Sequence, residues 1–336
     1  MTSQSKTTKT VRFYKAGDAS VLKLEDMPVQ APVDDEIRIA VEAIGLNRAE
    51  VMFREGQYLE TPDFPSKLGY EASGVIDAVG PDADGFKVGD RVSTIPAFSM
   101  GQYGVYGEQI IVPARAAAQY PARLSAVEGA SIWMQYITAF GGLVEIGKLT
   151  SGATVVITAA SSSVGLAAIQ IAKMLGATVV ATTRGKEKKQ FLRDAGANHV
   201  IVSDDEDLAK RVMDITSDKG ANVLFDPVGG PLLETLALAA ASRATIIEYG
   251  ALSSSPTPFP LFVALAKGLT IRGYTLFELT QNDEWLDRSK NFVYEGIESG
   301  ALKPVIDRTF TFTDIAEAHR YMESNQQKGK IVVTVP

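Results

Sequence analysis

Cysteine is absent from the 336-residue chain, and histidine occurs only twice, as His199 and His319. Without cysteine no disulfide can form, so nothing in the sequence requires an oxidising compartment. No apolar run reaches the roughly 18 residues of a membrane span, and the polar first ten residues lack the apolar core of a signal peptide. We therefore expect a cytoplasmic protein that does not associate with a membrane.

An excess of basic residues is absent as well. The formal net charge is −7 and the pI is about 5.1, whereas a nucleic-acid partner requires a clustered basic surface. We therefore expect no nucleic-acid partner. The apolar content of 46% and the charged content of 22% are typical of soluble globular proteins, and 336 residues suffice for two domains.

The pattern of predicted strands and helices changes along the chain. Residues 11–135 read as short strands broken by glycine and proline, and 36–45 alternate apolar and polar residues. From about 136 to 275, predicted strands alternate with helices that begin near Ser163, Lys186, Glu206 and Pro231. These strands span 154–158, 178–182, 199–202, 223–226, 245–249 and 269–272. Such alternation predicts an α/β fold with a doubly wound parallel sheet.

The last part of the chain is too small for a domain of its own. Two amphipathic helices, at 282–300 and at 314–329 with Asp314 as its N-cap, precede a final strand at 330–335. We therefore expect residues 276–336 to join residues 1–135 in one domain, with a dinucleotide-binding domain at 136–275.

A serine-rich turn joins the strand at 154–158 to the helix that begins near Ser163. In the G-x-G-x-x-G template of dinucleotide-binding turns, Ala160, Ser162 and Gly165 occupy the glycine positions. Free N–H groups at a helix start attract phosphate, and a serine hydroxyl can donate to phosphate or cap the helix. An ordinary strand–turn–helix with a serine N-cap explains the same residues.

A basic cluster follows the next predicted strand. Arg184 lies about 20 residues beyond Ser163, where an NAD site places an acidic residue and an NADP site accepts an arginine for the 2′-phosphate. Lys186, Lys188 and Lys189 follow. A solvated charged helix start is the alternative, but together with the serine turn the cluster favours NADPH as the cofactor.

These segments resemble the zinc-independent quinone oxidoreductases, the zeta-crystallin-like branch of the medium-chain dehydrogenase/reductase superfamily. The matching stretches follow the family order and include "AIGLNRAEVMFREGQY", "LGYEASGVIDAVGPDADGFKVGDRV", "ITAASSSVGLAAIQIAKMLGATVVATTR" and "FDPVGG". The resemblance implies a GroES-like, partly open β-barrel catalytic domain made from both chain ends, an inserted Rossmann domain, and a homodimer.

The resemblance also bears on metal and reaction. Zinc-dependent relatives carry Cys and His where this chain has Asn47 in "GLNRAE" and Tyr70 in "GYE", so no metal is expected. Without a Lewis acid at the substrate oxygen, the expected reaction is hydride transfer from NADPH to quinones or to the activated C=C bonds of α,β-unsaturated carbonyls. A 2-enoyl thioester reductase and a non-catalytic NADPH-binding protein are the alternatives.

Site residues follow from the resemblance position by position. Asn47 and Tyr58 are the expected catalytic residues, Asn47 beside the nicotinamide and Tyr58 as a wall residue or proton donor. A turn-forming asparagine is the simpler reading of Asn47. The expected cofactor-binding residues are Asn47, Thr138, Ser162, Ser163, Val164, Gly165, Arg184, Gly185, Lys188, Val228, Gly250, Ala251, Tyr274, Thr275 and Leu276.

Three further expectations concern structure. Glu71 and Arg91 are candidates for a buried hydrogen-bonded pair. A turn that needs positive φ is the alternative reading of Gly229 and Gly250, and it is compatible with cofactor binding. His319 lies on a predicted amphipathic helix and is expected to be structural or at the surface.

Overall fold

The chain folds into two units. The computed structural model describes residues 6–336. One unit combines the residues up to Met134 with Pro304–Pro336, and the other is Gln135–Lys303. The first boundary lies beside the predicted one after residue 135, whereas the second lies after Lys303 instead of after residue 275.

The second unit contains a six-stranded parallel sheet in the order β10-β9-β8-β11-β12-β13. Counted from the first strand of the unit, this is the 3-2-1-4-5-6 order of a Rossmann sheet. The strands are β8 (Thr154–Ile157), β9 (Thr178–Thr183), β10 (His199–Val202), β11 (Ala221–Asp226), β12 (Ala240–Glu248) and β13 (Thr270–Gly273). Each overlaps its predicted range, so the predicted doubly wound sheet is confirmed.

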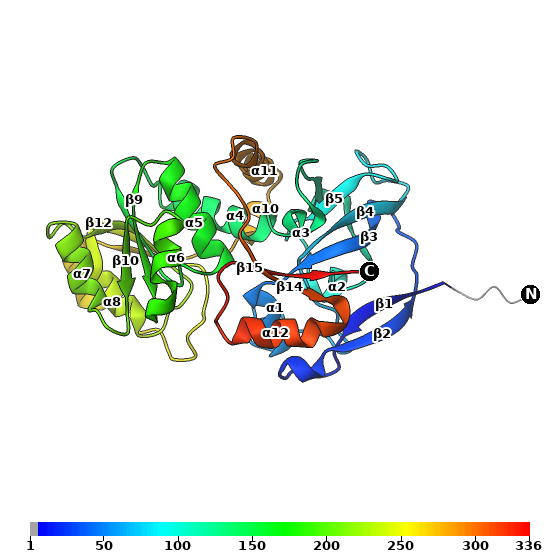
Figure 1. The fold of residues 1–336 in the computed structure, drawn as a ribbon, viewed down its shortest axis with the longest axis horizontal. Coiled ribbons are helices and arrows are strands. Elements are labelled where there is room, and N and C mark those ends of the chain that lie inside the picture. The colour runs from blue at the N-terminus through cyan, green and yellow to red at the C-terminus, as the bar shows by residue number, and fades with distance from the viewer. Residues whose placement is uncertain (1–5) are drawn as a thin grey trace, which may run out of the picture. The chain divides into compact units, whose positions relative to one another are not determined.

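Helices cover this sheet, as Figure 1 shows for α5 to α8. They are α5 (Ser163–Met174), α6 (Lys189–Asp194, after the 3-10 turn Lys186–Lys188), α7 (Leu208–Ile215), α8 (Leu232–Ala239) and α9 (Leu261–Lys267). Val156, Leu224 and Ile246 lie in register on adjacent strands and pack in one core with Val212 of α7 and Leu236 of α8. The strands read as continuous apolar runs because a parallel sheet is covered on both faces.

The helices after residue 275 belong to this unit too. They are α10 (Phe277–Thr280) and α11 (Asp283–Glu298). The α11 residue Phe292 packs on Phe140 of α4 (Trp133–Phe140), with 4.5 Å between ring centroids. Arg288 of α11 also pairs with Glu145 at 2.6 Å, in the π-helical turn Gly141–Ile146 that continues α4. These side-chain contacts, which no local pattern reveals, move the boundary to Pro304.

The first unit is built on a mostly antiparallel seven-stranded sheet. Its order is β14-β15-β3-β4-β5-β7, with β6 also paired to β3. The strands are β3 (Glu36–Gly45), β4 (Glu71–Val79), β5 (Arg91–Thr94), β6 (Gln109–Pro113), β7 (Ala117–Gln119), β14 (Ile306–Thr311) and β15 (Lys330–Thr334). The outer strands β14 and β7 do not pair with each other, so within the described residues the barrel stays open. The predicted fold class is confirmed.

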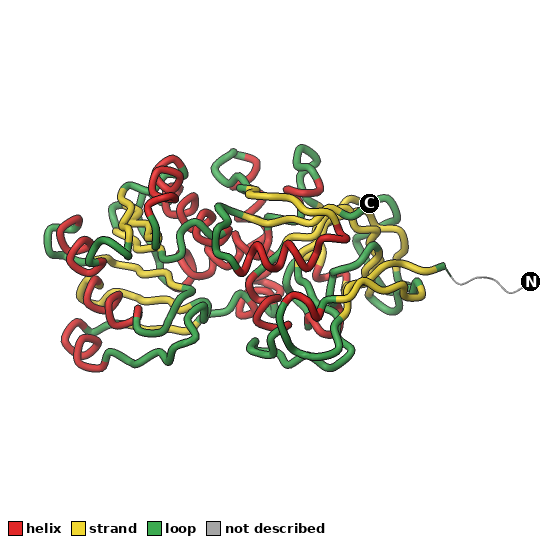
Figure 2. Tube along the Cα trace, turned by 60° about the horizontal axis from the view of Figure 1, so that its bottom comes forward, coloured by secondary structure: helices red, strands yellow, loops and turns green. Residues whose placement is uncertain are grey.

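Strands from the two ends of the chain pair with each other in this unit. The last strand β15 lies beside β3, which it meets with Val332 opposite Gly45. The short strands β1 (Thr7–Arg12) and β2 (Lys23–Pro28) form a separate antiparallel ribbon. Figure 2 shows the strands of both units in yellow, the helices in red and the loops in green.

Short helices complete the first unit. They are α1 (Arg48–Arg54), α2 (Met100–Tyr103), α3 (Ala126–Gly129) and α12 (Ile315–Glu323), with the 3-10 turns Ala19–Val21, Ala114–Ala116 and Phe312–Asp314. Asp314 is the N-cap residue of α12, as predicted, but it does not cap the helix with its side chain. Its side chain makes no cap hydrogen bond and instead accepts one from the Thr311 hydroxyl at 2.7 Å, because the 3-10 turn before α12 uses that residue.

Candidate active site

The serine-rich turn lies where β8 ends and α5 begins. Ser162 is the N-cap of α5, and its hydroxyl oxygen accepts from the Gly165 N–H at 3.0 Å. A Cβ on Gly165 would lie 2.6 Å from the Ala160 backbone, so only glycine permits this close packing. The Ser163 and Val164 N–H groups have no acceptor in the described chain. The turn therefore presents two unused donors at a helix start, a geometry that favours an anion.

A half-buried tyrosine, Tyr249, has its hydroxyl next to this turn. The Tyr249 ring stacks on Phe225, with 4.0 Å between centroids. Its hydroxyl is buried and lies near Ser162, but it makes no hydrogen bond of regular geometry among residues 6–336. Burial raises the pKa of this phenol, and Ser162 opposes the rise. A buried hydroxyl without a partner is costly, so the serine turn and Tyr249 together fit a polar ligand such as a pyrophosphate.

The basic cluster lies beside the same turn. The Lys188 ammonium donates to the Ser161 hydroxyl at 3.1 Å. Lys186 and Lys189 form ion pairs with acidic residues at 3.2 and 3.7 Å. The Arg184 guanidinium is exposed and forms no ion pair within the described part of the chain. Arg184 is thus the basic residue of this cluster that is left available for a phosphate.

The other predicted cofactor residues lie at or near the carboxyl edge of the sheet. Val228, Gly250 and Ala251 occupy the loops after β11 and β12, and Gly185 follows β9. Gly229 has a φ of +65°, so the alternative of a turn glycine holds there. Gly250 does not have a positive φ, so that alternative does not explain it. Its small size matters instead, because a Cβ there would lie 2.9 Å from the Pro227 carbonyl oxygen.

Tyr274, Thr275 and Leu276 follow β13, and Thr138 lies on α4. The Tyr274 hydroxyl donates to the Ile137 carbonyl at 3.3 Å, which brings the two segments together. Tyr274, Leu276 and Thr138 are buried, and Thr275 is half-buried. Of this group, the Tyr274 side chain is engaged inside the protein, which leaves its role toward a cofactor a prediction.

Two carboxyl groups that the sequence analysis missed end adjacent strands. Asp226 of β11 and Glu248 of β12 lie opposite each other in register. Asp226 accepts from the Thr158 hydroxyl and from the Gly229 N–H, the latter at 2.7 Å. No donor among the described residues reaches either buried oxygen of Glu248. Burial and the Asp226 charge raise the pKa of Glu248 to about 8. Two acidic residues at the ends of neighbouring predicted strands were the available signal.

In the first unit, Asn47 is the N-cap of α1. Its amide nitrogen lies 3.1–3.2 Å from three acceptors, the Gly45 carbonyl, Glu50 and Glu71. Its amide oxygen accepts from the Lys330 ammonium at 2.6 Å. The whole amide is therefore used inside the protein, as expected for a turn-forming and capping residue. Contact of Asn47 with a nicotinamide stays a prediction.

Glu71 pairs with Lys330 rather than with Arg91. Both Glu71 and Lys330 are fully buried, and the ammonium donates to one carboxylate oxygen. The other oxygen accepts from the Trp133 and Met134 N–H groups at 3.1 and 2.9 Å, at the start of α4. Arg91 is exposed and lies over the Tyr120 ring. The predicted Glu71–Arg91 pair is wrong because the true partner arrives from the last strand.

A chain of hydrogen bonds continues from this cluster. Glu50 accepts from the Asn47 N–H and from the Tyr106 hydroxyl, at 2.6 and 2.8 Å. Burial raises the pKa of Glu50 to about 7, although these donors oppose the rise. Arg54, which can only donate, lies 3.0 Å from His319 Nδ1, so the ring proton is on Nε2 and is donated to Tyr106. Burial lowers the pKa of His319 to about 3, and its predicted structural role is that of a buried neutral residue.

Tyr58 lies in the loop after α1 and is half-buried. Its ring is tilted against Tyr70, with 6.5 Å between centroids. Burial raises the pKa of Tyr58 to about 12, and the Tyr70 hydroxyl opposes the rise. The side chain therefore stays protonated at neutral pH, which a proton donor requires.

No group of three or more His, Cys, Asp or Glu side chains within residues 6–336 is arranged to hold a metal ion. The same residues contain no helix long and apolar enough to cross a membrane.

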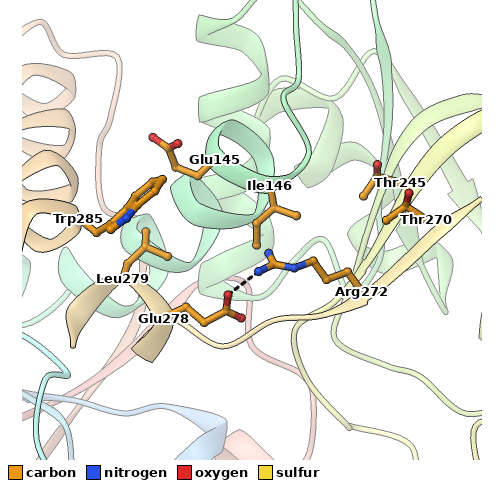
Figure 3. A pocket seen from close by; sticks show the side chains of 8 residues that line it. All are labelled: Glu145, Ile146, Thr245, Thr270, Arg272, Glu278, Leu279 and Trp285. Atoms are coloured by element: carbon orange, nitrogen blue, oxygen red, sulfur yellow. Dashed lines mark hydrogen bonds and ion pairs between the residues drawn. The ribbon is translucent and has the colours of Figure 1, made fainter. Parts of the chain in front are cut away.

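An open pocket of about 550 Å³ lies at the β13 edge, where Figure 3 shows Arg272 paired with Glu278 and Trp285 opposite. None of its lining residues is a predicted site residue.

The fold and the turn define a medium-chain dehydrogenase/reductase. Residues 33–122 match the alcohol dehydrogenase GroES-like domain, and residues 163–290 match the zinc-binding dehydrogenase family. Quinone oxidoreductase from Pseudomonas aeruginosa is 30% identical over 97% of this chain and 99% of its own, and the human quinone oxidoreductase is 30% identical over 99% of both. The crystal structure of Escherichia coli quinone oxidoreductase complexed with NADPH superposes with a TM-score of 0.91 at 28% identity, over 97% of this chain and 99% of that one. The chain belongs to the quinone oxidoreductase family, as the sequence predicted.

Proposed function

We propose that this protein is an NADPH-dependent reductase that transfers a hydride to quinones or to activated C=C bonds of α,β-unsaturated carbonyls, without zinc. The observation that carries the proposal is the set of unused donors at the start of α5. The Ser163 and Val164 N–H groups and the buried Tyr249 hydroxyl make no hydrogen bond of regular geometry in the described chain. They converge on one turn at the carboxyl edge of the sheet, where open α/β sheets bind their ligands.

In this proposal, two groups of residues bind different parts of the cofactor. The Ser163 and Val164 N–H groups hold the pyrophosphate, and Arg184 with Lys188 holds the 2′-phosphate. When bound, the dinucleotide supplies the hydride. Relatives named quinone oxidoreductase, and the NADPH complex of the Escherichia coli enzyme, support both the cofactor and the acceptor class.

Tyr58 is the proposed source of the proton that the reduced acceptor needs. Its phenol remains protonated through neutral pH because burial raises the pKa to about 12. In the same unit, Asn47 links the start of α1 to Glu71 and Lys330 through its amide. In this proposal Tyr58 is the catalytic residue, and Asn47 keeps its predicted contact with the nicotinamide.

The buried ammonium of Lys330 supports the proposal that the protein binds no zinc. The ammonium of Lys330 is buried between Asn47 and Glu71, at the positions that align with the metal-binding segments of zinc-dependent relatives. A divalent ion there would meet a buried positive charge, which is unfavourable. Metal analysis of the purified protein and assays in the presence of a chelator test this part directly.

The decisive experiment is NADPH oxidation against a panel of quinones, enals, enones and a crotonyl thioester. We expect turnover with quinones or enones that survives a chelator. Far faster turnover of the thioester would identify a 2-enoyl thioester reductase instead. Tight NADPH binding without oxidation by any acceptor would leave only a binding protein.

Cofactor preference is tested with Arg184→Asp. We expect a loss of about 2 kcal/mol, or roughly thirtyfold, in NADPH binding, because a charge-assisted contact is removed, and little change for NADH. Arg193→Asp, an exposed arginine on α6, is the matched control and should leave both cofactors unchanged. Equal losses for NADPH and NADH in Arg184→Asp would contradict the 2′-phosphate assignment.

We also propose that the protein is a homodimer. Phe259, Leu261, Phe262 and Leu265 are at least half exposed, Phe262 by 84%. They lie on and before α9, directly before the edge strand β13. An exposed apolar patch next to an unpaired strand edge is a typical subunit interface. Phe262→Glu should yield monomers in size-exclusion chromatography with light scattering, whereas Leu59→Glu, at another exposed leucine, should not.

A further inference from the structure

We propose that Glu248 is a positioning residue of the cofactor site: it is held as a neutral carboxylic acid that donates to Asp226, and this bond fixes the loops after β11 and β12. The inference rests on the proposed function only in naming the ligand of those loops. The state of Glu248 itself follows from the geometry of the described residues.

The two loops run together beyond the ends of their strands. The N–H groups of Tyr249, Leu252 and Ser253 donate to the carbonyls of Asp226, Pro227 and Val228, each at 2.9 Å. Val228, Gly250 and Ala251, which the sequence analysis assigns to the cofactor, therefore lie on one doubled loop. Asp226 and Glu248 form its base, because they are the last residues of their strands and lie in register.

Asp226 is the member of the pair that accepts hydrogen bonds from other residues. One of its oxygens accepts from the Thr158 hydroxyl and the other from the Gly229 N–H at 2.7 Å. Two donors stabilise a carboxylate. The second of these bonds also ties the Gly229 turn, which has a φ of +65°, to the end of β11.

Glu248 has the opposite environment. Both of its oxygens are buried and neither has a donor among residues 6–336. The missing Cβ of Gly229 would lie 3.8 Å from one of them, so the side chain lies under the Gly229 turn. A carboxylate without donors beside another carboxylate is strongly unfavourable. A protonated Glu248 removes both costs, because its O–H donates to Asp226.

Among residues 6–336, no cation is seen to compensate a second negative charge at this point. Asp226 is the charged group that acts on Glu248, and burial is the larger effect. Tyr249, the first residue after β12, contributes a neutral phenol whose pKa burial raises. The covering segment 253–257, with the sequence "SSSPT", brings no charge. Loss of the Glu248 proton therefore places two carboxylates against each other beneath the doubled loop.

The test compares Glu248→Gln, whose amide can still donate to Asp226 but cannot ionise, with Glu248→Leu, which cannot donate. NADPH affinity is measured by fluorescence titration from pH 6.5 to 9.5. In the wild type we expect the dissociation constant to rise about tenfold above pH 8, since ligand affinity follows the protonation state of a coupled group. Glu248→Gln should keep the neutral-pH affinity within twofold and lose the alkaline rise. Glu248→Leu should bind about tenfold more weakly at every pH.

A second readout needs no ligand. Urea unfolding of the Gln135–Lys303 unit is followed through Trp285 in a Trp133→Phe background, since the sequence has only two tryptophans. The folded state holds the Glu248 proton to higher pH than the unfolded chain does, so the urea midpoint should fall between about pH 5 and pH 8. Glu248→Gln should abolish this fall, and the exposed α8 residue Glu234 changed to Gln should retain it.

The outcomes separate the two proposals. A wild type that binds no NADPH but shows the Glu248-dependent fall in urea midpoint would overturn the proposed function and keep the acid pair. An alkaline loss of affinity and stability that persists unchanged in Glu248→Gln would overturn the acid pair, whatever cofactor binds. A flat wild-type profile in both measurements would overturn it equally.

Discussion

The buried Lys330–Glu71 pair should dominate the stability of the first unit. Replacing Lys330 with Met removes an ammonium that is fully buried and donates to Glu71 and Asn47. Breaking one side of a buried ion pair costs about 3–5 kcal/mol. Glu71 keeps the Trp133 and Met134 N–H donors at 3.1 and 2.9 Å, so we expect about 4 kcal/mol.

The assay uses Trp133 as the reporter. Trp133 is fully buried, its backbone N–H donates to Glu71, and its indole donates to Ser93 at 2.7 Å. In a Trp285→Phe background, tryptophan fluorescence therefore follows the unit that contains Glu71. With a slope of about 3 kcal/mol per molar urea, the loss lowers the midpoint by roughly 1.3 M.

Two controls make the result specific. The exposed Lys15 changed to Met should leave the midpoint within about 0.2 M, the shift expected for a neutral surface substitution (~0.5 kcal/mol or less). The double variant of Lys330→Met with Glu71→Gln should recover at least about half of the loss, because no unpaired charge remains buried. A shift of Lys330→Met no larger than that of Lys15→Met, or a double variant less stable than the single one, would refute the reasoning.

Three further predictions concern other residues. His319→Gln keeps one donor and one acceptor but removes a group whose folded pKa is about 3. Because the unfolded chain binds a proton near pH 6.5 and the folded chain does not, the free energy of unfolding of the wild-type unit should fall by up to about 4 kcal/mol relative to the variant between pH 7 and pH 3. Urea unfolding measures this difference. Gly165→Val places a side chain 2.6 Å from the Ala160 backbone and should weaken NADPH binding at least about tenfold, or about 1.4 kcal/mol, in titration, whereas Gly273→Ala, where a Cβ meets nothing within 4 Å, should not. Tyr58→Phe should lower kcat for enones by about 10²-fold or more and leave NADPH affinity unchanged; equal turnover by both proteins would reduce Tyr58 to a wall of the pocket.

Much of the second unit was predictable because its determinants are local. Apolar runs four to six residues long give the buried parallel strands, and His199–Val202 has the predicted bounds. The serine N-cap and the tight packing of Gly165 also follow from residues three positions apart. Local chemistry of this kind is legible in a sequence.

The errors share a different cause. The boundary after residue 275 fails because α11 packs on Phe140, far back in the chain. The partner of Glu71 was missed because Lys330 reaches it through a strand pairing across 259 residues. Glu248 was missed because its significance depends on strand register, which the amino-acid pattern of one strand does not contain. Each depends on which distant segment becomes a neighbour.

The arrangement of the first unit has a consequence for its synthesis. Residues 135–303 form a contiguous unit and can fold as soon as they have emerged, whereas β14 and β15 complete the other sheet from residues 306–334. Until Lys330 arrives, Glu71 is a carboxylate at a core position with no counterion. The strands β3 to β7 are therefore made first, and their sheet stays incomplete while residues 135–303 fold. Nascent chains stalled before residue 330 should be the species most exposed to proteases and chaperones.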